Sequence, residues 1–214
     1  MKIGILISGR GSNMVALVDA VKSGEIPDSE VVVVVSDKAN AAGLEKARER
    51  DVESVVVERK GRTREEHDAA ILKELKDRGV ELVCLGGYMR LLSCDFIQAF
   101  PNRIVNIHPS LLPAFPGLDA QRQALQHGVK ISGCTVHFVD EALDNGAIIL
   151  QKVVDVRDDD TEETLSTRIL GQEHEAYVEA VRRIVTGRVS IDGRKAVFNA
   201  ETAEDAEFAE DFSE

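Results

Sequence analysis

The chain has 214 residues, of which 43% are hydrophobic, and its formal net charge is −12. This length and composition permit one large domain with a sizeable core, while the acidic charge argues against nucleic acid as a partner, because phosphate backbones require basic protein surface. The longest apolar run, VVVVV at 31–35, is too short to cross a bilayer, so we expect no membrane partner. The N-terminal residues contain no basic leader and no cleavage site of small residues, so we expect no signal peptide. The cysteines offer no disulfide framework, so we expect a cytoplasmic protein.

Charge distribution and cysteine content indicate the domain organisation and argue against disulfide and metal sites. Residues 201–214 carry seven acidic side chains and no basic one, and removing these seven charges from −12 leaves −5 for residues 1–200. We therefore expect a single domain over 1–200, followed by an acidic and disordered tail over 201–214. Cys84, Cys94 and Cys134 form no CxxC pair, so we expect neither a disulfide framework nor a metal site.

Strand-like and helix-like segments alternate from residue 3 to residue 128. Continuous apolar runs such as VVVVVS are typical of parallel strands covered on both faces, whereas Met14, Leu17 and Val21 follow helical spacing. The predicted order is strand 3–8, helix 12–24, strand 31–36, helix 41–51, a short strand in SVVVE, helix 63–79, strand 80–87, strand 103–108 and helix 119–128.

The helix over 63–79 has clear signals at both ends. Thr63 and Glu66 have the spacing of a capping box, and Gly79 is a typical residue just past a helix end. The side chains at both ends, as well as the periodicity, therefore predict a helix over 63–79.

The pattern changes after residue 130. Two strand-like runs, 131–140 and 146–156, are joined by the five residues EALDN, which are too few for a helical crossover. We therefore expect an antiparallel strand pair. A long helical region follows over 161–187, where Thr161 and Thr164 form a partial capping box.

The alternating elements imply a doubly wound, mostly parallel α/β sheet with an antiparallel C-terminal strand pair and a long C-terminal helix. Ligands of such sheets bind beyond the carboxyl ends of the strands. The segments SGRGSN, GGYMRLL and NIHPS each follow a predicted strand, so we expect these three loops on one rim of the sheet.

The loop SGRGSN at 8–13 has the composition of an anion site. Gly9 and Gly11 permit close backbone approach, and the helix that follows offers free N–H groups. The loop is not a dinucleotide fingerprint, because Met14 occupies the third glycine position, and it is not a Walker loop. A tight turn with Ser12 as the helix N-cap explains the same residues.

Asn106 and His108 end the strand predicted over 103–108, and they share one face because side chains alternate along a strand. An amide can donate to a developing oxyanion, and an imidazole can transfer protons near neutral pH. Asp144 is the best candidate for a carboxylate beside this imidazole. Taken singly, each residue also has a purely structural explanation, and we expect His137 to be a packed or supporting residue rather than a catalyst.

Five segments taken together resemble the phosphoribosylglycinamide formyltransferase family of purine biosynthesis: ISGRGSNM, LGGYMRLLS, NIHPSLLPAFPG, GCTVHFVDEALDNGAIILQ and QEH. The resemblance extends from residue 1 to about residue 190. It implies a Rossmann-like formyltransferase fold, with phosphate bound by the N-terminal half and folate by the C-terminal half. It also implies transfer of the formyl group of 10-formyltetrahydrofolate to the amine of glycinamide ribonucleotide, through an oxyanion and without a metal, in a monomer or homodimer.

The family motifs carry residue roles onto this chain. The implied catalytic residues are Asn106, His108 and Asp144. The implied substrate-binding residues are Gly11, Ser12, Asn13 and Glu173. The implied folate-binding residues are Arg64, Met89, Arg90, Leu91, Leu92, Asn106, Asp140, Glu141, Ala142 and Leu143. Leu170 and the DAQ segment at 119–121 depart from the family pattern, so we assign no role to either.

Three alternatives remain open. A formyltetrahydrofolate hydrolase would give the formyl group to water, and it usually has an N-terminal regulatory domain, which we do not expect here because the sequence begins with the first strand. A formyltransferase for initiator methionyl-tRNA needs an additional C-terminal domain and basic surface, whereas this sequence ends in acidic residues. A non-catalytic folate or nucleotide sensor would not need the three residues of the predicted catalytic group.

Overall fold

The computed structural model describes residues 1–198, and the acidic tail predicted over 201–214 lies outside the described residues. The strands are β1 (Lys2–Ile7), β2 (Glu30–Ser36), β3 (Ser54–Val56), β4 (Leu82–Leu85), β5 (Ile104–His108), β6 (Ile131–Phe138), β7 (Ile148–Asp155), β8 (Val189–Asp192) and β9 (Lys195–Phe198). The helices are α1 (Ser12–Ser23), α2 (Ala42–Arg48), α3 (Arg64–Asp77), α4 (Cys94–Ala99), α5 (Ala120–His127) and α6 (Glu162–Val185).

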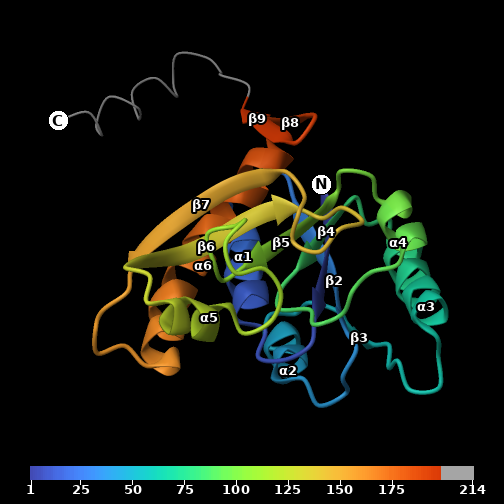
Figure 1. Cartoon of the computed structure of the whole chain (residues 1–214). Coiled ribbons are helices and arrows are strands. Elements are labelled where there is room, and N and C mark those ends of the chain that lie inside the picture. Colours follow the sequence, from blue (N-terminus) through green and yellow to red (C-terminus); the bar gives the residue numbers. More distant parts are fainter. Residues whose placement is uncertain (199–214) are drawn as a thin grey trace.

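These strands form one sheet with the order β3-β2-β1-β4-β5-β6-β7-β9-β8 (Figure 1). The five strands from β3 to β5 in this order are parallel to one another, and β6 then pairs antiparallel with both β5 and β7. The predicted α/β fold with an antiparallel C-terminal pair and a long C-terminal helix is therefore confirmed. The connections explain it, because helical crossovers join the parallel strands while a short loop joins β6 to β7.

Helices cover both faces of the sheet. One core cluster joins Leu17 of α1 and Ile169 of α6 to the sheet, and the other joins Ile71 of α3 and Phe96 of α4 to it. Figure 1 shows α3 and α4 side by side, away from α1 and α6. Among residues 1–198, no helix combines the length and the apolar character that a membrane span requires.

A buried hydroxyl ties α6 to the middle of the sheet. Tyr177 is fully buried, and its hydroxyl group lies 2.9 Å from the carbonyl oxygen of Val105 and 3.2 Å from that of Leu85, as their donor. This contact fixes α6 across β4 and β5. Glu173 lies one helical turn before Tyr177 on the same face of α6, so it is directed toward the carboxyl ends of these strands.

The caps predicted from the sequence at the starts of α3 and α1 differ in how they agree with the structure. Thr63 and Glu66 form the predicted reciprocal capping box of α3. The alternative explanation of the glycine-rich loop, with Ser12 as the N-cap of α1, does not hold, because Gly11 occupies the cap position in the left-handed conformation (φ 68°) and no side chain caps the helix. The first N–H groups of α1 therefore keep no side-chain partner at this end.

Candidate active site

The three loops predicted to share a rim do converge. They follow β1, β4 and β5, which are parallel neighbours in the sheet, and the carboxyl ends of such strands meet at one edge. A fourth segment, the 139–147 connection between β6 and β7, leaves the sheet beside Val105 and turns back far enough to bring Asp144 next to His108. The three predicted catalytic residues therefore lie on two segments that are distant in the sequence.

His108 lies between two oxygen atoms and is only 5% exposed. Its Nε2 atom is 2.8 Å from the carbonyl oxygen of Phe115, and its Nδ1 atom is 3.5 Å from Oδ2 of Asp144. A carbonyl oxygen accepts hydrogen bonds only, so Nε2 is the donor in this contact. Both ring nitrogens of His108 therefore face acceptor atoms.

Asn106 is oriented by a histidine on the neighbouring strand. Its Nδ2 atom lies 3.2 Å from Nε2 of His137, and the Nδ1 atom of His137 donates to the carbonyl oxygen of Phe138 at 2.8 Å. Burial lowers the pKa of His137 below its ordinary value, so the neutral ring accepts at Nε2 and the Asn106 amide donates to it. The prediction of His137 as a packed or supporting residue agrees with this contact, which the antiparallel pairing of β5 with β6 creates.

Asp144 is held from the side of His108. Its Oδ2 atom accepts a hydrogen bond from the backbone N–H of Gly117 at 2.8 Å, and its Oδ1 atom is 3.8 Å from Nε2 of His137. The backbone at Asp144 has φ 48°, a left-handed value that aspartate adopts more readily than most residues. One carboxylate thus contacts the loop after β5 and faces both histidines of the site.

The glycine-rich loop and Glu173 form the second part of the site. Asn13, in the first turn of α1, donates from Nδ2 to Oε2 of Glu173 at 2.8 Å. Both residues are buried, with Glu173 8% exposed, and burial raises the pKa of Glu173 above its ordinary value. Glu173 therefore does not lie on a solvated helix face. It lies beside the free N–H groups at the start of α1, where an anion is favoured.

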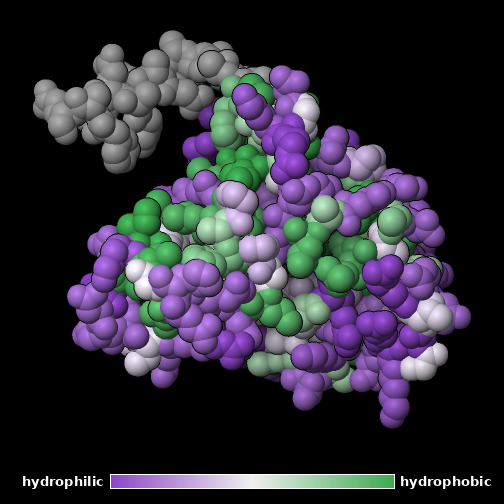
Figure 2. Space-filling model, in the orientation of Figure 1, coloured by the Kyte–Doolittle hydropathy of each residue, from purple (hydrophilic) through white to green (hydrophobic). Residues whose placement is uncertain are grey.

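The predicted folate-binding residues lie mostly on the surface. Met89 and Leu91 are each 60% exposed, and Leu143 is 56% exposed. Figure 2 shows apolar side chains gathered in patches on the face of the molecule drawn there. Exposed apolar patches of this kind mark binding surfaces more often than chance, and the loop after β4 and the 139–147 connection supply these three side chains.

Two hydrogen bonds attach the loop after β4 to residues that follow β1 and β2. The backbone N–H of Met89 donates to Oγ of Ser8 at 3.0 Å, and Arg90 donates from Nε to Oδ2 of Asp37, a buried carboxylate, at 2.8 Å. Arg64 is not on this loop. It is the first residue of α3, and its ion-pair partner within the described residues is Glu65.

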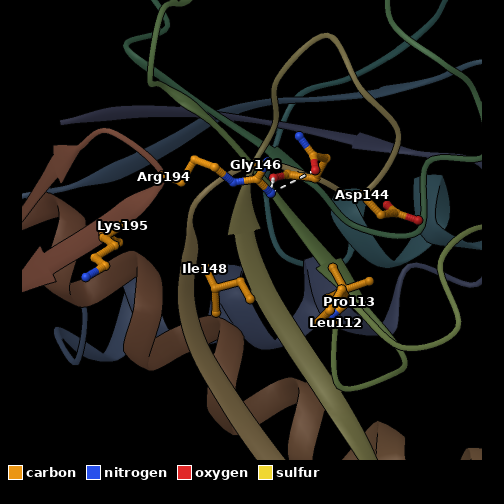
Figure 3. A pocket seen from close by; sticks show the side chains of 9 residues that line it. Leu112, Pro113, Asp144, Gly146, Ile148, Arg194 and Lys195 are labelled. Atoms are coloured by element: carbon orange, nitrogen blue, oxygen red, sulfur yellow. Dashed lines mark hydrogen bonds between the residues drawn. The ribbon is translucent and has the colours of Figure 1, made fainter.

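A cavity borders the other side of the Asp144 loop (Figure 3). Its volume is about 450 Å³, and it is lined by Leu112, Pro113, Asp144, Asn145, Gly146, Ile148, Arg194, Lys195 and Ala196. The last three residues belong to the hairpin of β8 and β9, which is not among the elements predicted from the sequence. The signal that could have found this hairpin is Asp192-Gly193 between two short alternating runs.

Residues 1–181 match the family model described as formyl transferase. The chain belongs to the formyl transferase family. The match includes every residue to which the sequence resemblance assigned a role, and it ends within α6, before the hairpin formed by β8 and β9.

Named members of the formyl transferase family resemble the chain over most of its length. It is 46% identical over 192 residues to the trifunctional purine biosynthetic protein adenosine-3 of Drosophila melanogaster, but it spans only 14% of that protein's length. It is 41% identical to the phosphoribosylglycinamide formyltransferase of Bacillus subtilis, covering 86% of this chain and 94% of the relative.

Solved structures agree with this family membership. The crystal structure of glycinamide ribonucleotide transformylase 1 from Symbiobacterium toebii matches with a TM-score of 0.92 and 52% identity, covering 94% of each chain. A formyltetrahydrofolate deformylase from Pseudomonas syringae also matches, with a TM-score of 0.85 and 26% identity, covering 93% of this chain and 66% of that one. Formyl transferase relatives with different named reactions therefore share this fold.

Proposed function

We propose that this protein transfers the formyl group of 10-formyltetrahydrofolate to the amine of glycinamide ribonucleotide, a step of purine biosynthesis. The observation that carries the proposal is the meeting of Asn106, His108 and Asp144 beside an anion-binding loop, since a hydrolase acting on water would need no phosphate site. The products are formylglycinamide ribonucleotide and tetrahydrofolate. We further propose that the protein acts in the cytoplasm, without nucleic-acid or membrane partners, as a monomer or a homodimer.

The reaction begins with attack of the substrate amine on the formyl carbon. The formyl oxygen becomes an oxyanion, and donors placed around it lower the barrier most effectively when they are fixed in advance. Asn106 supplies one donor through its amide, which His137 orients at 3.2 Å. His108 supplies the other, and this requires that one of its two donors leave its present acceptor for the substrate oxygen.

Asp144 supports the charged imidazole and accepts the proton that the attacking amine loses, directly or through water. Its Oδ2 atom is 3.5 Å from Nδ1 of His108, so the carboxylate faces this ring nitrogen directly. The tetrahedral intermediate then collapses, the bond to the folate nitrogen breaks, and that nitrogen takes a proton. No protein nucleophile is needed.

Substrate binding divides between the two parts of the site. Gly11, Ser12 and Asn13 would receive the phosphate at the N-terminus of α1, where backbone N–H groups favour an anion. Glu173 would accept hydrogen bonds from the ribose or the glycinamide end, and its contact with Asn13 at 2.8 Å links it to the phosphate loop.

The folate would lie between the loop after β4 and the 139–147 connection. Apolar walls from exposed side chains and backbone hydrogen bonds suit a flat pteridine ring. The walls would come from Met89, Arg90, Leu91 and Leu92 on one side and from Asp140, Glu141, Ala142 and Leu143 on the other, with Arg64 toward the tail of the folate.

One assay tests the proposed function against its closest alternative. The protein is supplied with 10-formyltetrahydrofolate, with and without glycinamide ribonucleotide, while tetrahydrofolate and formate are measured. We expect tetrahydrofolate to form only when the ribonucleotide is present, and formylglycinamide ribonucleotide to form in equal amount. Release of formate without the ribonucleotide would instead support the hydrolase, and no turnover of either kind would support a non-catalytic sensor.

A further inference from the structure

The hairpin of β8 and β9 ends in a tight turn next to the 139–147 connection. Asp192 pairs with Lys195 across the hairpin, so the turn consists of Gly193 and Arg194 alone. Gly193 has φ 58°, the left-handed value that a two-residue hairpin turn requires and glycine adopts without strain. Lys195 in turn pairs with Ile148, the first residue of β7. Arg194 is therefore placed at a fixed point beside the start of β7.

The hairpin itself is anchored to the body of the protein. Val189, Ile191 and Ala196 pack against the main core cluster, and the guanidinium carbon of Arg183, on α6, lies 4.7 Å from the ring centroid of Phe198. Stacking of this kind attracts a cation to an aromatic face. The hairpin is thus joined to both β7 and α6. A residue that hydrogen-bonds to the turn of this hairpin is therefore restrained relative to the sheet.

Arg194 contacts the residue that follows Asp144. Its Nη2 atom donates to Oδ1 of Asn145 at 2.9 Å and to the backbone oxygen of Asn145 at 3.4 Å. Asn145 also connects the two ends of the 139–147 connection, because its Nδ2 atom donates to Oδ2 of Asp140 at 3.2 Å. Figure 3 shows Arg194 approaching the loop from one side while the Asp144 carboxylate points away from it.

We propose that Arg194 is a positioning residue, which holds Asn145 chiefly through its side-chain oxygen and thereby keeps Asp144 at its working distance from His108. This inference rests on the proposed function. Asp144 is held on the His108 side by the N–H of Gly117, and Arg194 supplies the restraint on the opposite side. The match to the family model ends at residue 181, so this contact comes from a part of the chain outside the matched region.

Arg194 affects the geometry of the loop more than the stability of the protein. Arg194 is exposed, so its hydrogen bonds add little to overall stability. The position of Asp144 is more sensitive, because a displacement of 1 Å in a reacting group can cost on the order of 100-fold in rate. The backbone at Asp144 has a left-handed φ of 48°, and a conformation of this kind persists only where surrounding contacts hold it.

Amide hydrogen exchange of residues 140–146 tests the restraint without any need for turnover. Arg194→Ala is compared with Lys195→Ala, which removes the adjacent positive charge from the same cavity wall but keeps the backbone pairing with Ile148. We expect exchange in this loop to become about 10-fold faster in Arg194→Ala and to stay unchanged in Lys195→Ala. Equal exchange in the two variants would overturn the inference.

Steady-state kinetics then test the effect on catalysis. We expect Arg194→Ala to lower kcat about 10-fold with little change in the KM of glycinamide ribonucleotide, because the restraint acts on the reacting geometry. In an Asn145→Ala background the same substitution should have no further effect. A kcat equal to that of Lys195→Ala would overturn the positioning role. Absence of formyl transfer in the wild-type protein would instead refute the proposed function, and the hydrogen-exchange comparison would then be the remaining test of the restraint.

Discussion

His108 has an acceptor opposite each ring nitrogen, and the two acceptors come from different loops. Phe115 belongs to the proline-rich segment after β5, whereas Asp144 belongs to the connection between β6 and β7. The two contacts therefore restrain different atoms of the ring. The Asp144 carboxylate lies opposite Nδ1 and can be removed by substitution, whereas the acceptor opposite Nε2 is the backbone carbonyl of Phe115.

Substitution of His108 by Ala and of Asp144 by Asn separates proton transfer from folding. We expect each variant to lower kcat by at least ~100-fold, because each removes a participant in general acid–base catalysis. Asn is suited to position 144, since it tolerates the left-handed φ of 48° and removes only the charge. Thermal unfolding checks the fold, and His127→Ala, an exposed histidine on α5, is the control. Near-normal turnover in either variant would refute the catalytic assignment.

Glu173→Gln tests the role of the buried carboxylate near the phosphate loop. Gln can still accept the hydrogen bond from Asn13, so the variant removes charge and little else. We expect the KM of glycinamide ribonucleotide to rise about 10-fold while kcat changes less, because the substrate then donates to a neutral acceptor in place of a charged one, and hydrogen bonds to charged groups are the stronger. Glu175→Gln, an exposed position on the same helix, is the matched control. Equal KM values in the two variants would contradict the assignment.

The Glu173 carboxylate should also make the free energy of unfolding depend on pH. Burial raises the pKa of Glu173 above the ordinary value of 4.5, so the folded state binds the proton more tightly than the unfolded state. Stability from this group is present at low pH and falls as the pH rises from about 4.5 through the raised pKa. Urea unfolding of Glu173→Gln should lack this fall.

The loop that carries Asp144 depends on a close backbone approach at its exit. A Cβ atom added to Gly146 would stand 1.9 Å from the carbonyl oxygen of Phe138, and that distance is far inside van der Waals contact. The N–H of Phe138 also donates to the carbonyl oxygen of Ala147 at 2.9 Å. The two ends of the loop are therefore pinned together, and a side chain at Gly146 must push them apart.

Gly146→Ala should lower both stability and turnover. We expect a loss of about 1–3 kcal/mol in the free energy of unfolding, as overpacking typically costs, together with a larger relative loss in kcat because Asp144 is two residues away. Gly171→Ala is the control, since open space surrounds Gly171. Urea unfolding and the formyl-transfer assay measure the two effects, and wild-type values for both would show that the loop has no need of the glycine.

The elements that the sequence predicted well are those with a strong local signal. The buried parallel strands appear as apolar runs, and the capping pair Thr63 and Glu66 marks the start of α3 as predicted. The hairpin of β8 and β9 was missed because each strand has only four residues, all of them half-buried or exposed, so neither appears as an apolar run. The six-residue helix α4 was missed for a similar reason, since Phe96 is its only fully buried residue.

The site divides in the same way between local and tertiary information. The alternation of Asn106 and His108 on one strand face follows from the sequence, whereas the orientation of Asn106 by His137 depends on the register of β5 with β6. No periodicity encodes that register. The contact between Arg194 and Asn145 joins residues 49 positions apart, so local patterns could not have indicated it.

At the scale of the whole molecule, we propose that residues 1–200 form one formyltransferase domain and that residues 201–214 are an appendage to it. Deletion of 201–214 removes seven acidic side chains. We expect kcat and both KM values to remain about the same, because the residues proposed for catalysis and binding all lie at or before Glu173. Kinetics of the shortened chain at low and high salt measure this, and a large loss of kcat would assign the segment a direct role.

The stability of the protein should also depend on pH through His137. This histidine is 2% exposed, and burial lowers its pKa from the ordinary value of 6.5. Below pH 6.5 the unfolded state therefore binds a proton that the folded state binds less well. Stability is fully present above about pH 6.5 and is lost as the pH falls toward the lowered pKa. Burial also lowers the pKa of His174, which adds to the loss in the same direction.

His137→Gln isolates the share of His137 in this pH dependence. Gln keeps an acceptor within reach of Asn106 but does not titrate, so we expect a smaller loss of unfolding free energy between pH 7.5 and pH 5.5 than in the wild type, measured by urea denaturation. His127→Gln, at an exposed position, should lose as much as the wild type. If all three proteins lost stability equally, the acid sensitivity would have to arise from His174 or from the carboxylates, and the contact between His137 and Asn106 would carry no pH-dependent energy.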